Sequence, residues 1–364
     1  MAVDRHKKIE LYIFVLEYDK TNSVLSNVPK VCDFLFGLSG SLRVEATKVK
    51  FPKDAPPEYV VHEYGGGSIR KRLIAIFRLI AIVSRIPKTK IRDVAVFHYM
   101  NHKSVIWPGV LFRFLGCYQV LWYAHASKPL SLRVSAKIVD HIFTSARSAF
   151  PLRSNKVTEI GQLVKTSDFQ FSTTSESEKI KGLVSVGRIA SSKNLAKAIR
   201  LVSLFPDHLN SLTLIGPISE AEYLEELKSL ARIYNVDIFL TGEVPNENLS
   251  QVLSMYSFYF NGTDEAVDKA VIEAALVGCI VLSENVNTLR LTGMDAFWEN
   301  SDVQPQHDVF NQMRILGLLS DSELSNLRIK ISNSTKERNS LETNLLLIYN
   351  HIREGRFSKQ KQSS

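Results

Sequence analysis

The second half of the chain alternates short apolar runs with helical stretches, and this rhythm constrains the fold more than any other feature of the sequence. Apolar runs predict strands at residues 182–189, 211–216, 236–242, 258–260 and 279–284. A helical stretch separates each run from the next. Strands joined in this way pair in parallel through right-handed crossovers and form an open, doubly wound sheet. Such sheets bind ligands at the carboxyl ends of their strands.

A weaker version of this alternation runs through the first half of the chain. Short buried strands are expected at residues 11–16, 94–98, 119–123 and 141–144. With 364 residues, the chain is too long for one ordinary core. We therefore expect an α/β fold with two doubly wound Rossmann-like domains that face a cleft.

Changes in composition set the expected domain boundaries. Residues 1–164 form the N-terminal domain and residues 181–340 the C-terminal domain. Residues 165–180 are the expected linker, because Lys165–Ser177 is polar, rich in serine and threonine, and without periodicity. Residues 341–364 are expected to form a terminal helix and a polar tail, with the helix returning to the N-terminal domain.

The cysteines, the N-terminus and the length of the apolar runs indicate the cellular compartment of the protein. Cys32, Cys117 and Cys279 lie far apart and lack CxxC spacing, so neither a disulfide framework nor a structural zinc site is indicated. The charged N-terminus, Met1–Glu10, does not resemble a secretory signal. No run approaches the roughly 18 apolar residues that a membrane span requires. We expect a cytoplasmic protein.

The net charge of +8 includes a basic, apolar segment between Glu63 and Asp93. Its cations have no acidic residue among them and are Arg70, Lys71, Arg72, Arg78, Arg85, Lys88, Lys90 and Arg92. One interpretation is an amphipathic helix packed on the N-terminal sheet. The other is a helix in peripheral contact with anionic lipid at the inner face of the membrane. Nucleic acid is disfavoured, because interleaved exposed aromatics and recognised motifs are missing.

Two cations follow the first strand of the C-terminal domain. Arg188 comes directly after Val186-Gly187, and Lys193 lies at the start of the next helical stretch. Both can face the crevice at the sheet end, as two fixed charges where a diphosphate would lie. An Arg and a Lys in one loop are also common as solvated surface charges.

A second group of candidates follows the fourth predicted strand of this domain. Glu265 lies in the loop and Glu273 in the next helix. Carboxylates there can accept hydrogen bonds from vicinal hydroxyls of a sugar or ribose, although exposed helix charges also occur at this spacing. The backbone amides of Ala266, Val267 and Asp268 lead into a helix N-terminus and could hold an anion. We expect the Asp268 side chain to cap that helix.

Three segments carry a resemblance to a known family, and they read SVGRIASSKN, TGEVPNENL and GTDEAVDKAVIEAALVGC. They resemble the donor-binding domain of family 4 retaining glycosyltransferases, which have the GT-B fold and an E-x7-E motif. The resemblance implies that Arg188 and Lys193 bind the donor diphosphate and that Glu273 binds the ribose hydroxyls. It also implies that Glu265 binds hydroxyls of the transferred sugar and that Val244 lies near the base.

The similarity extends more faintly into the N-terminal domain, through LWYAH and Val139–Gln162. His125 matches the histidine that the family places against the donor sugar, although a histidine at a strand end can also be purely structural. The chain departs from the family at Ala266-Val267-Asp268, where Gly-Phe-Gly is usual.

The resemblance implies transfer of a sugar from a UDP- or GDP-linked donor to a glycan or lipid-linked acceptor, with retention of configuration. Acceptor binding would fall to the N-terminal domain, and polysaccharide biosynthesis is the expected context. The chain lacks a DxD-type carboxylate pair, so we expect no metal and no cofactor, with Arg188 and Lys193 in the place of a metal.

Three alternatives remain. A catalytically inactive nucleotide-sugar-binding or scaffold protein would share the C-terminal domain. An epimerase could use the same two-domain fold and would differ in its products. A nicotinamide-dependent dehydrogenase is disfavoured, because GxGxxG follows none of the predicted strands.

Overall fold

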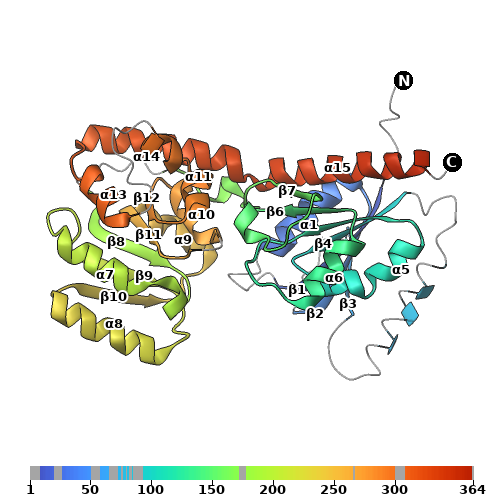
Figure 1. The fold of residues 1–364 in the computed structure, drawn as a ribbon, viewed down its shortest axis with the longest axis horizontal. Coiled ribbons are helices and arrows are strands. Elements are labelled where there is room, and N and C mark those ends of the chain that lie inside the picture. Colours follow the sequence, from blue (N-terminus) through green and yellow to red (C-terminus); the bar gives the residue numbers. More distant parts are fainter. Residues whose placement is uncertain are drawn as a thin grey trace. The chain divides into compact units, whose positions relative to one another are not determined.

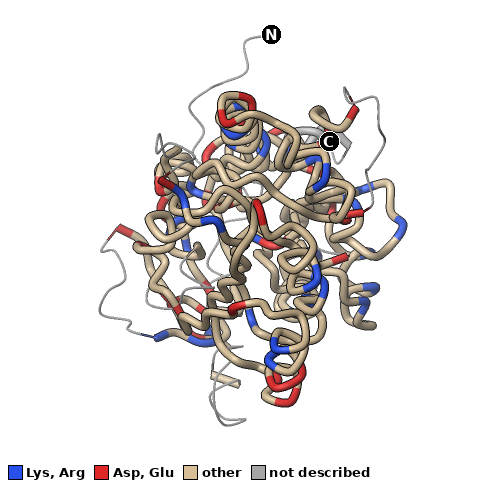
Figure 2. The backbone as a smooth tube through the Cα atoms, turned by 90° about the vertical axis from the view of Figure 1, so that its left-hand side faces the viewer, with Lys and Arg blue, Asp and Glu red and all other residues tan. Residues whose placement is uncertain are grey.

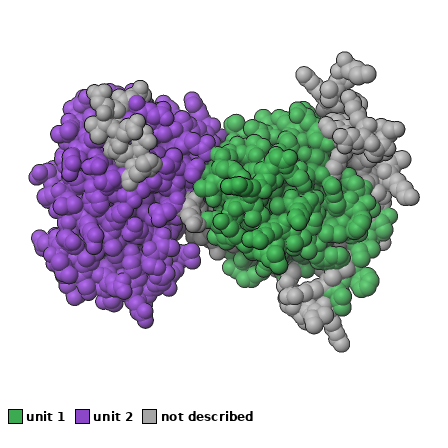
Figure 3. Space-filling model, in the orientation of Figure 1, with its two compact units in different colours: residues 1–163, 341–364 green, residues 164–340 purple. Residues whose placement is uncertain are grey.

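The computed structural model describes residues 9–19, 27–50, 58–64, 93–171, 178–264, 267–299 and 308–362, together with single positions between 73 and 84. The chain divides into two compact units (Figure 3). Unit 1 comprises residues 1–163 and 341–364, and unit 2 comprises residues 164–340. Each unit contains one parallel sheet with helices on both faces.

Unit 1 is built on a seven-stranded sheet with the order β3-β2-β1-β4-β5-β6-β7, all pairs being parallel. The strands are β1 (Glu10–Tyr18), β2 (Leu42–Val49), β3 (Val60–Glu63), β4 (Val94–Tyr99), β5 (Tyr118–Trp122), β6 (His141–Thr144) and β7 (Val157–Glu159). The order reverses between β1 and β4, which makes the carboxyl ends of these strands the switch point of a doubly wound sheet.

The central strand β1 shows why this sheet is covered on both sides. Leu11, Ile13 and Val15 point into one fully buried cluster, and Tyr12 and Phe14 point into another. Parallel strands read as continuous apolar runs because both of their faces are buried. The helices of unit 1 are α1 (Asn27–Ser39), α4 (His102–Ile106), α5 (Gly109–Phe114), α6 (Leu130–Ile138) and α15 (Leu341–Gln362). Helices α1 and α15 pack together on the first face (Figure 1).

Unit 2 is built on a five-stranded parallel sheet with the order β10-β9-β8-β11-β12. The strands are β8 (Ile180–Val186), β9 (Ser211–Ile215), β10 (Asp237–Gly242), β11 (Tyr256–Asn261) and β12 (Ile280–Ser283). Here the order reverses between β8 and β11. The loops that follow these two strands therefore flank the switch point, where doubly wound sheets bind ligands.

The helices of unit 2 cover both faces of this sheet (Figure 1). They are α7 (Leu195–Leu204), α8 (Ala221–Tyr234), α9 (Asn246–Ser254), α10 (Lys269–Leu276), α11 (Val286–Thr292), α12 (Met294–Glu299), α13 (Val309–Leu316) and α14 (Asp321–Asn339). Helix α7 packs with α8 and α13, whereas α10 packs with α9 and α14. Helix α14 begins with a capping box between Ser320 and Glu323, which satisfies amides of its first turn.

The predicted α/β architecture is confirmed, because both sheets are parallel and doubly wound. The terminal helix returns to the N-terminal unit as expected, and it continues to Gln362, so that most of the expected polar tail is helical. Strands β2, β3 and β7 were missing from the prediction. The described part of the expected linker, 165–180, lies inside unit 2, where Phe169 is buried and Val164 pairs with Ser340.

Most of the basic segment lies outside the described residues. Arg78 is its one cation within them, and its Nη2 lies 2.6 Å from Oε2 of the fully buried Glu45 on β2. Elsewhere in the described backbone, basic and acidic residues are interspersed (Figure 2). Among the described residues, none of the helices combines the length and the apolar character needed to cross a membrane.

Candidate functional site

The carboxyl end of the unit 2 sheet gathers most of the predicted site residues. Arg188 lies two residues after the end of β8, and Lys193 lies in the short 3-10 turn Ser191–Lys193 before α7. Val244 lies half-buried in the loop between β10 and α9. Val267 and Asp268 precede α10, on the loop that follows β11. Since parallel strands end at the same edge of a sheet, these loops are neighbours.

Close backbone contact holds the loops after β8 and β9 together. Gly216 has φ +138°, and a Cβ atom at this position would lie 2.2 Å from the carbonyl oxygen of Gly187. Gly187 itself has φ +143°, and the Lys193 stem passes over it. Both positions therefore require glycine. The Tyr259 hydroxyl, 3.3 Å from both the amide nitrogen and the carbonyl oxygen of Val186, further fixes the end of β8.

The loops after β8 and β11 also touch directly. A Cβ atom on Gly262 would lie 2.3 Å from the carbonyl oxygen of Lys193, so only glycine permits this approach. Asn194, next to Lys193, adopts a left-handed conformation with φ 48°. Asparagine tolerates that conformation better than most residues. The two loops that flank the switch point thus form one continuous surface.

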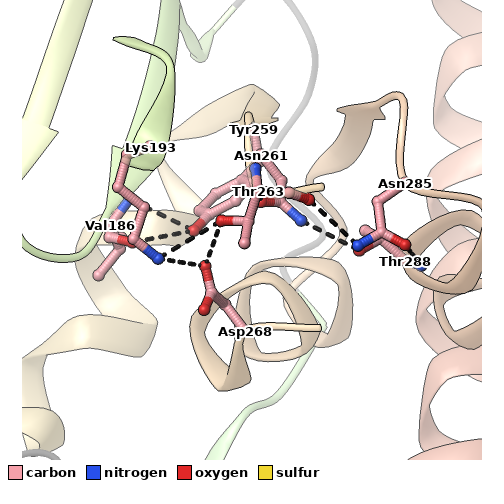
Figure 4. Close-up of polar contacts among 8 residues, drawn as sticks. All are labelled: Val186, Lys193, Tyr259, Asn261, Thr263, Asp268, Asn285 and Thr288. Atoms are coloured by element: carbon pink, nitrogen blue, oxygen red, sulfur yellow. Dashed lines mark hydrogen bonds and ion pairs between the residues drawn. The ribbon is translucent and has the colours of Figure 1, made fainter. Parts of the chain in front are cut away.

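Lys193 is the centre of a polar cluster on this surface (Figure 4). Its Nζ lies 2.5 Å from Oδ2 of Asp268 and 3.5 Å from Oγ1 of Thr263. The Thr263 hydroxyl donates to the same Asp268 oxygen at 3.0 Å. The expected capping role of Asp268 is therefore wrong: it occupies the N-cap position of α10, but its side chain makes no capping hydrogen bond and holds Lys193 instead.

Arg188 is exposed and has an acidic neighbour of its own. Glu220 accepts a hydrogen bond from the Ser191 amide at 2.9 Å. That bond is the main cause that lowers the pKa of Glu220, and the positive charge of Arg188 contributes to the same shift. Each of the two candidate cations therefore lies near a carboxylate.

Glu273 is buried in α10, with 4% of its side chain exposed. Its Oε1 forms an ion pair with Nζ of Lys269 at 2.7 Å. The charges of Asp268 and Glu273 both raise the pKa of Tyr259, although burial is the larger cause. Glu273 is therefore a buried carboxylate close to the Lys193 cluster, rather than a solvated helix charge.

Two of the predicted residues, Glu265 and Ala266, lie outside the described residues. Val267 is described and its side chain is buried. His125 belongs to unit 1, where it follows β5 and is exposed. Its Nδ1 accepts a hydrogen bond from the Ser127 amide at 3.0 Å, which places the proton of the neutral ring on Nε2.

The sequence prediction missed the polar network behind Lys193. Asn261 accepts a hydrogen bond from the Thr263 amide at 3.0 Å and donates to Oγ1 of Thr288 at 3.0 Å. Asn285 donates to the Thr263 carbonyl at 3.1 Å and caps α11 through its Oδ1 (Figure 4). The sequence could have indicated this network in part, because asparagines that end strands or precede helices commonly form such hydrogen bonds.

Residues 166–293 match the family model described as "Glycosyl transferases group 1". The match contains β8 to α11 and thus the whole Lys193 cluster. A comparison with curated proteins gave no match.

Solved structures are similar to the chain along nearly its whole length. Anabaena HepE in complex with UDP and glucose has a TM-score of 0.68 at 12% identity, covering 95% of this chain and 100% of that one. A glycosyltransferase from Rickettsia africae has a TM-score of 0.69 at 10% identity, covering 95% and 98%. Sucrose-phosphate synthase from Thermosynechococcus elongatus has a TM-score of 0.66 at 12% identity, also covering 95% and 98%. These likenesses show the fold, which is GT-B as predicted.

Proposed function

We propose that this chain is a glycosyltransferase that takes a sugar from a nucleotide-sugar donor and transfers it to a glycan or lipid-linked acceptor. One observation carries the proposal: Arg188 and Lys193 line one pocket at the end of β8, and Lys193 pairs with Asp268 at the start of α10, the helix that holds the buried Glu273. Two further findings support it. The group 1 match includes this site, and a structure of the same fold was solved with UDP and glucose.

The chemistry of the reaction explains why cations would be needed there. When the bond between the anomeric carbon and phosphate breaks, negative charge grows on the leaving diphosphate. Preorganised cations stabilise that charge in the transition state. We assign this role to Arg188 and Lys193 and propose that the reaction needs no metal ion.

The remaining predicted residues have proposed roles on the other parts of the donor. Glu273 would accept hydrogen bonds from the ribose hydroxyls, and Glu265 from hydroxyls of the transferred sugar. Val244 would contact the base. In unit 1, His125 would donate from Nε2 to the transferred sugar, because its Nδ1 is already occupied by the Ser127 amide. Backbone amides at Ala266, Val267 and Asp268 would face the donor phosphates.

The finer features of the reaction are also proposals. We propose family 4 membership through Glu265 and Glu273, and retention of the anomeric configuration. Analysis of the product by NMR would test retention, and activity in the presence of EDTA would test metal independence. UDP and GDP are the two leaving groups to be compared.

For the acceptor we propose a substrate at the cytoplasmic face of a membrane, with unit 1 in peripheral contact with anionic lipid. Leu73 and Phe77, in the basic segment, have 46% and 68% of their surface exposed. Apolar side chains among cations are typical of interfacial helices. If the purified protein does not bind anionic liposomes at low salt, a soluble acceptor is preferred.

A screen of nucleotide sugars by thermal stabilisation tests the donor site. A ligand at 100 times its dissociation constant stabilises the folded chain by about 2.7 kcal/mol. The Glu273→Gln variant should lose most of this response, whereas the control Glu226→Gln, on the exposed side of α8, should retain it. If none of the nucleotide sugars stabilises the wild-type chain, the proposal fails.

One observation favours a second candidate, a nucleotide-sugar-binding protein without transferase activity. Lys193 is already paired with Asp268, and the family that this domain resembles carries glycine in place of Asp268. Such a protein would respond in the thermal screen but release no nucleoside diphosphate from the donor. A transferase would release it and form a glycosylated acceptor.

A further inference from the structure

The ion pair between Lys193 and Asp268 is unusually well placed to interfere with the proposed donor site. The two side chains are 17% and 29% exposed, and Thr263 bonds to both of them. Partly buried charge pairs are screened less by solvent than exposed ones. The positive charge of Lys193 is therefore largely balanced before any ligand arrives.

A bound diphosphate and the Asp268 carboxylate would both require the Lys193 ammonium group. Two anions within a few ångströms of one another repel, and one cation cannot compensate both. Arg188 is exposed, so solvent screens its charge more strongly than that of the partly buried Lys193. Binding of the diphosphate therefore favours departure of Asp268 from Lys193.

The fold offers Asp268 a second position. It stands at the N-cap of α10, with φ −67° and ψ 143°, and the structure shows no capping hydrogen bond from its side chain. Extended backbone angles and a short carboxylate side chain are what an N-cap needs. A rotation of the Asp268 side chain would therefore exchange Lys193 for the amides of the first turn of α10.

We propose that Asp268 is an internal competitor of the donor diphosphate: it holds Lys193 in the free protein and moves to the N-cap of α10 when the diphosphate binds. This inference depends on the proposed function, because it assumes that Lys193 binds a nucleoside diphosphate. Its consequence is weakened binding of the diphosphate, which also makes release of the diphosphate product easier.

The Asp268→Asn variant tests this competition. Asparagine is as good an N-cap as aspartate and has nearly the same volume, but it carries no charge to hold Lys193. We expect the full-length variant to bind UDP or GDP, whichever the wild-type chain prefers, about tenfold more tightly, as befits the loss of one charge-assisted hydrogen bond. Calorimetry with the matching nucleoside should show no change, because the nucleoside lacks the diphosphate.

Asp264→Asn is the matched control. Asp264 lies in the same loop and is exposed, so its substitution removes one negative charge without freeing Lys193. We expect its diphosphate affinity to stay within about twofold of wild type. Thr263→Val provides a second test that leaves both charges in place, and loss of its bond to Asp268 should strengthen diphosphate binding about two- to threefold.

The outcomes separate the two proposals. If the wild-type chain binds a nucleoside diphosphate and Asp268→Asn binds it equally or more weakly, the competition is overturned and the donor site stands. An equal gain in Asp264→Asn would also overturn it, because a general charge effect would then suffice. If neither the wild-type chain nor the variants bind UDP or GDP, both proposals fail.

Discussion

Both sheets carry ion pairs at their carboxyl ends, in unit 1 between Lys50 and Asp19 at 3.1 Å, but the loops that follow β4 and β11 beside the two switch points differ. In unit 2, the loops at the switch point hold ion pairs, Lys193 with Asp268 and, farther along, Lys197 with Glu284 at 2.6 Å. In unit 1, the loop after β4 is held by the neutral Asn101, which donates to the Val15 carbonyl and to the Tyr64 hydroxyl.

The loop after β5 in unit 1 continues the neutral pattern. The Tyr123 hydroxyl donates to the Ser127 carbonyl at 3.1 Å, and His125 accepts from the Ser127 amide. Cations such as Lys193 suit a site that must bind a charged diphosphate, whereas neutral donors and acceptors suit the hydroxyls of a sugar chain. The contrast between these unit 1 loops and the loop after β11 agrees with the proposed donor site in unit 2 and the proposed acceptor site in unit 1.

The largest effect on this comparison is expected when Lys193, the central cation of the unit 2 cluster, is removed. Lys193→Met should weaken UDP or GDP binding about 100-fold, because it deletes a cation and leaves Asp268 as an unpaired charge near the phosphates. Calorimetric titration measures the change. Lys228→Met, on α8 away from the switch point, is the control and should bind as wild type does. Equal affinities of wild type and Lys193→Met would refute the assignment.

Acid should affect unit 1 through its buried histidines. Burial lowers the pKa of His98 to about 4, and this neutral ring is held by Ser104 and Gln119. The unfolded chain therefore binds a proton at His98 more tightly than the folded chain does. As a result, the contribution of His98 to the free energy of unfolding is full at neutral pH and falls as the pH drops below about 6.5. Unit 1 should lose about 2 kcal/mol from this group between pH 7 and pH 5.

Hydrogen exchange of β4 and β5, measured at both pH values, checks this loss. His98→Gln should reduce the pH dependence in these strands and leave that of β8 and β11 in unit 2 unchanged. If the exchange of β4 and β5 in the variant depends on pH as steeply as in the wild type, another group must be responsible. His141, whose pKa burial also lowers to about 4, is the next candidate.

The neutral hydrogen-bond network of Asn261 and Asn285 behind Lys193 should contribute to the stability of the fold more than to diphosphate binding. Asn285→Ala removes both the cap of α11 and the bond to the Thr263 carbonyl, and should lower the free energy of unfolding by about 1 kcal/mol. Denaturant unfolding measures this loss. Asn287→Ala, on the same helix without a capping role, should cost less. Equal losses of unfolding free energy in the two variants would show that the cap adds no stability beyond that of another residue of the helix.

The smallest effect is expected at the second ion pair. The side chains of Lys197 and Glu284 are 29% and 27% exposed, and such a pair contributes up to about 1 kcal/mol of stability. Lys197→Met should lower stability by that amount or less and leave diphosphate affinity within about twofold. A large loss of affinity would extend the donor site beyond the Lys193 cluster and sharpen the comparison.

The sequence predicted the fold well where a strand is a continuous apolar run. All five strands of unit 2 were expected, because each is apolar and bounded by helical stretches. Strand β2 escaped prediction because Glu45 and Arg43 interrupt its apolar pattern, and the buried charge of Glu45 is compensated by Arg78, a partner distant in sequence. Strands β3 and β7 are too short for periodicity to identify.

The site was predictable in its positions but not in its pairings. Arg188, Lys193 and Glu273 could be placed at one sheet end from strand order and spacing alone. The bond between Lys193 and Asp268 could not, because side-chain partners across two loops depend on distances that only the folded chain sets. Local rules favoured capping for Asp268, and a tertiary ion pair overrode them.

Crystal structures of the chain, grown separately with UDP and with GDP, test most directly the central claim that Lys193 and Arg188 bind the diphosphate. We expect the diphosphate oxygens of the bound nucleotide within hydrogen-bonding distance of Lys193 Nζ and the Arg188 guanidinium, and the Asp268 carboxylate turned toward α10. A nucleotide bound elsewhere, with the pair between Lys193 and Asp268 intact, would contradict the account.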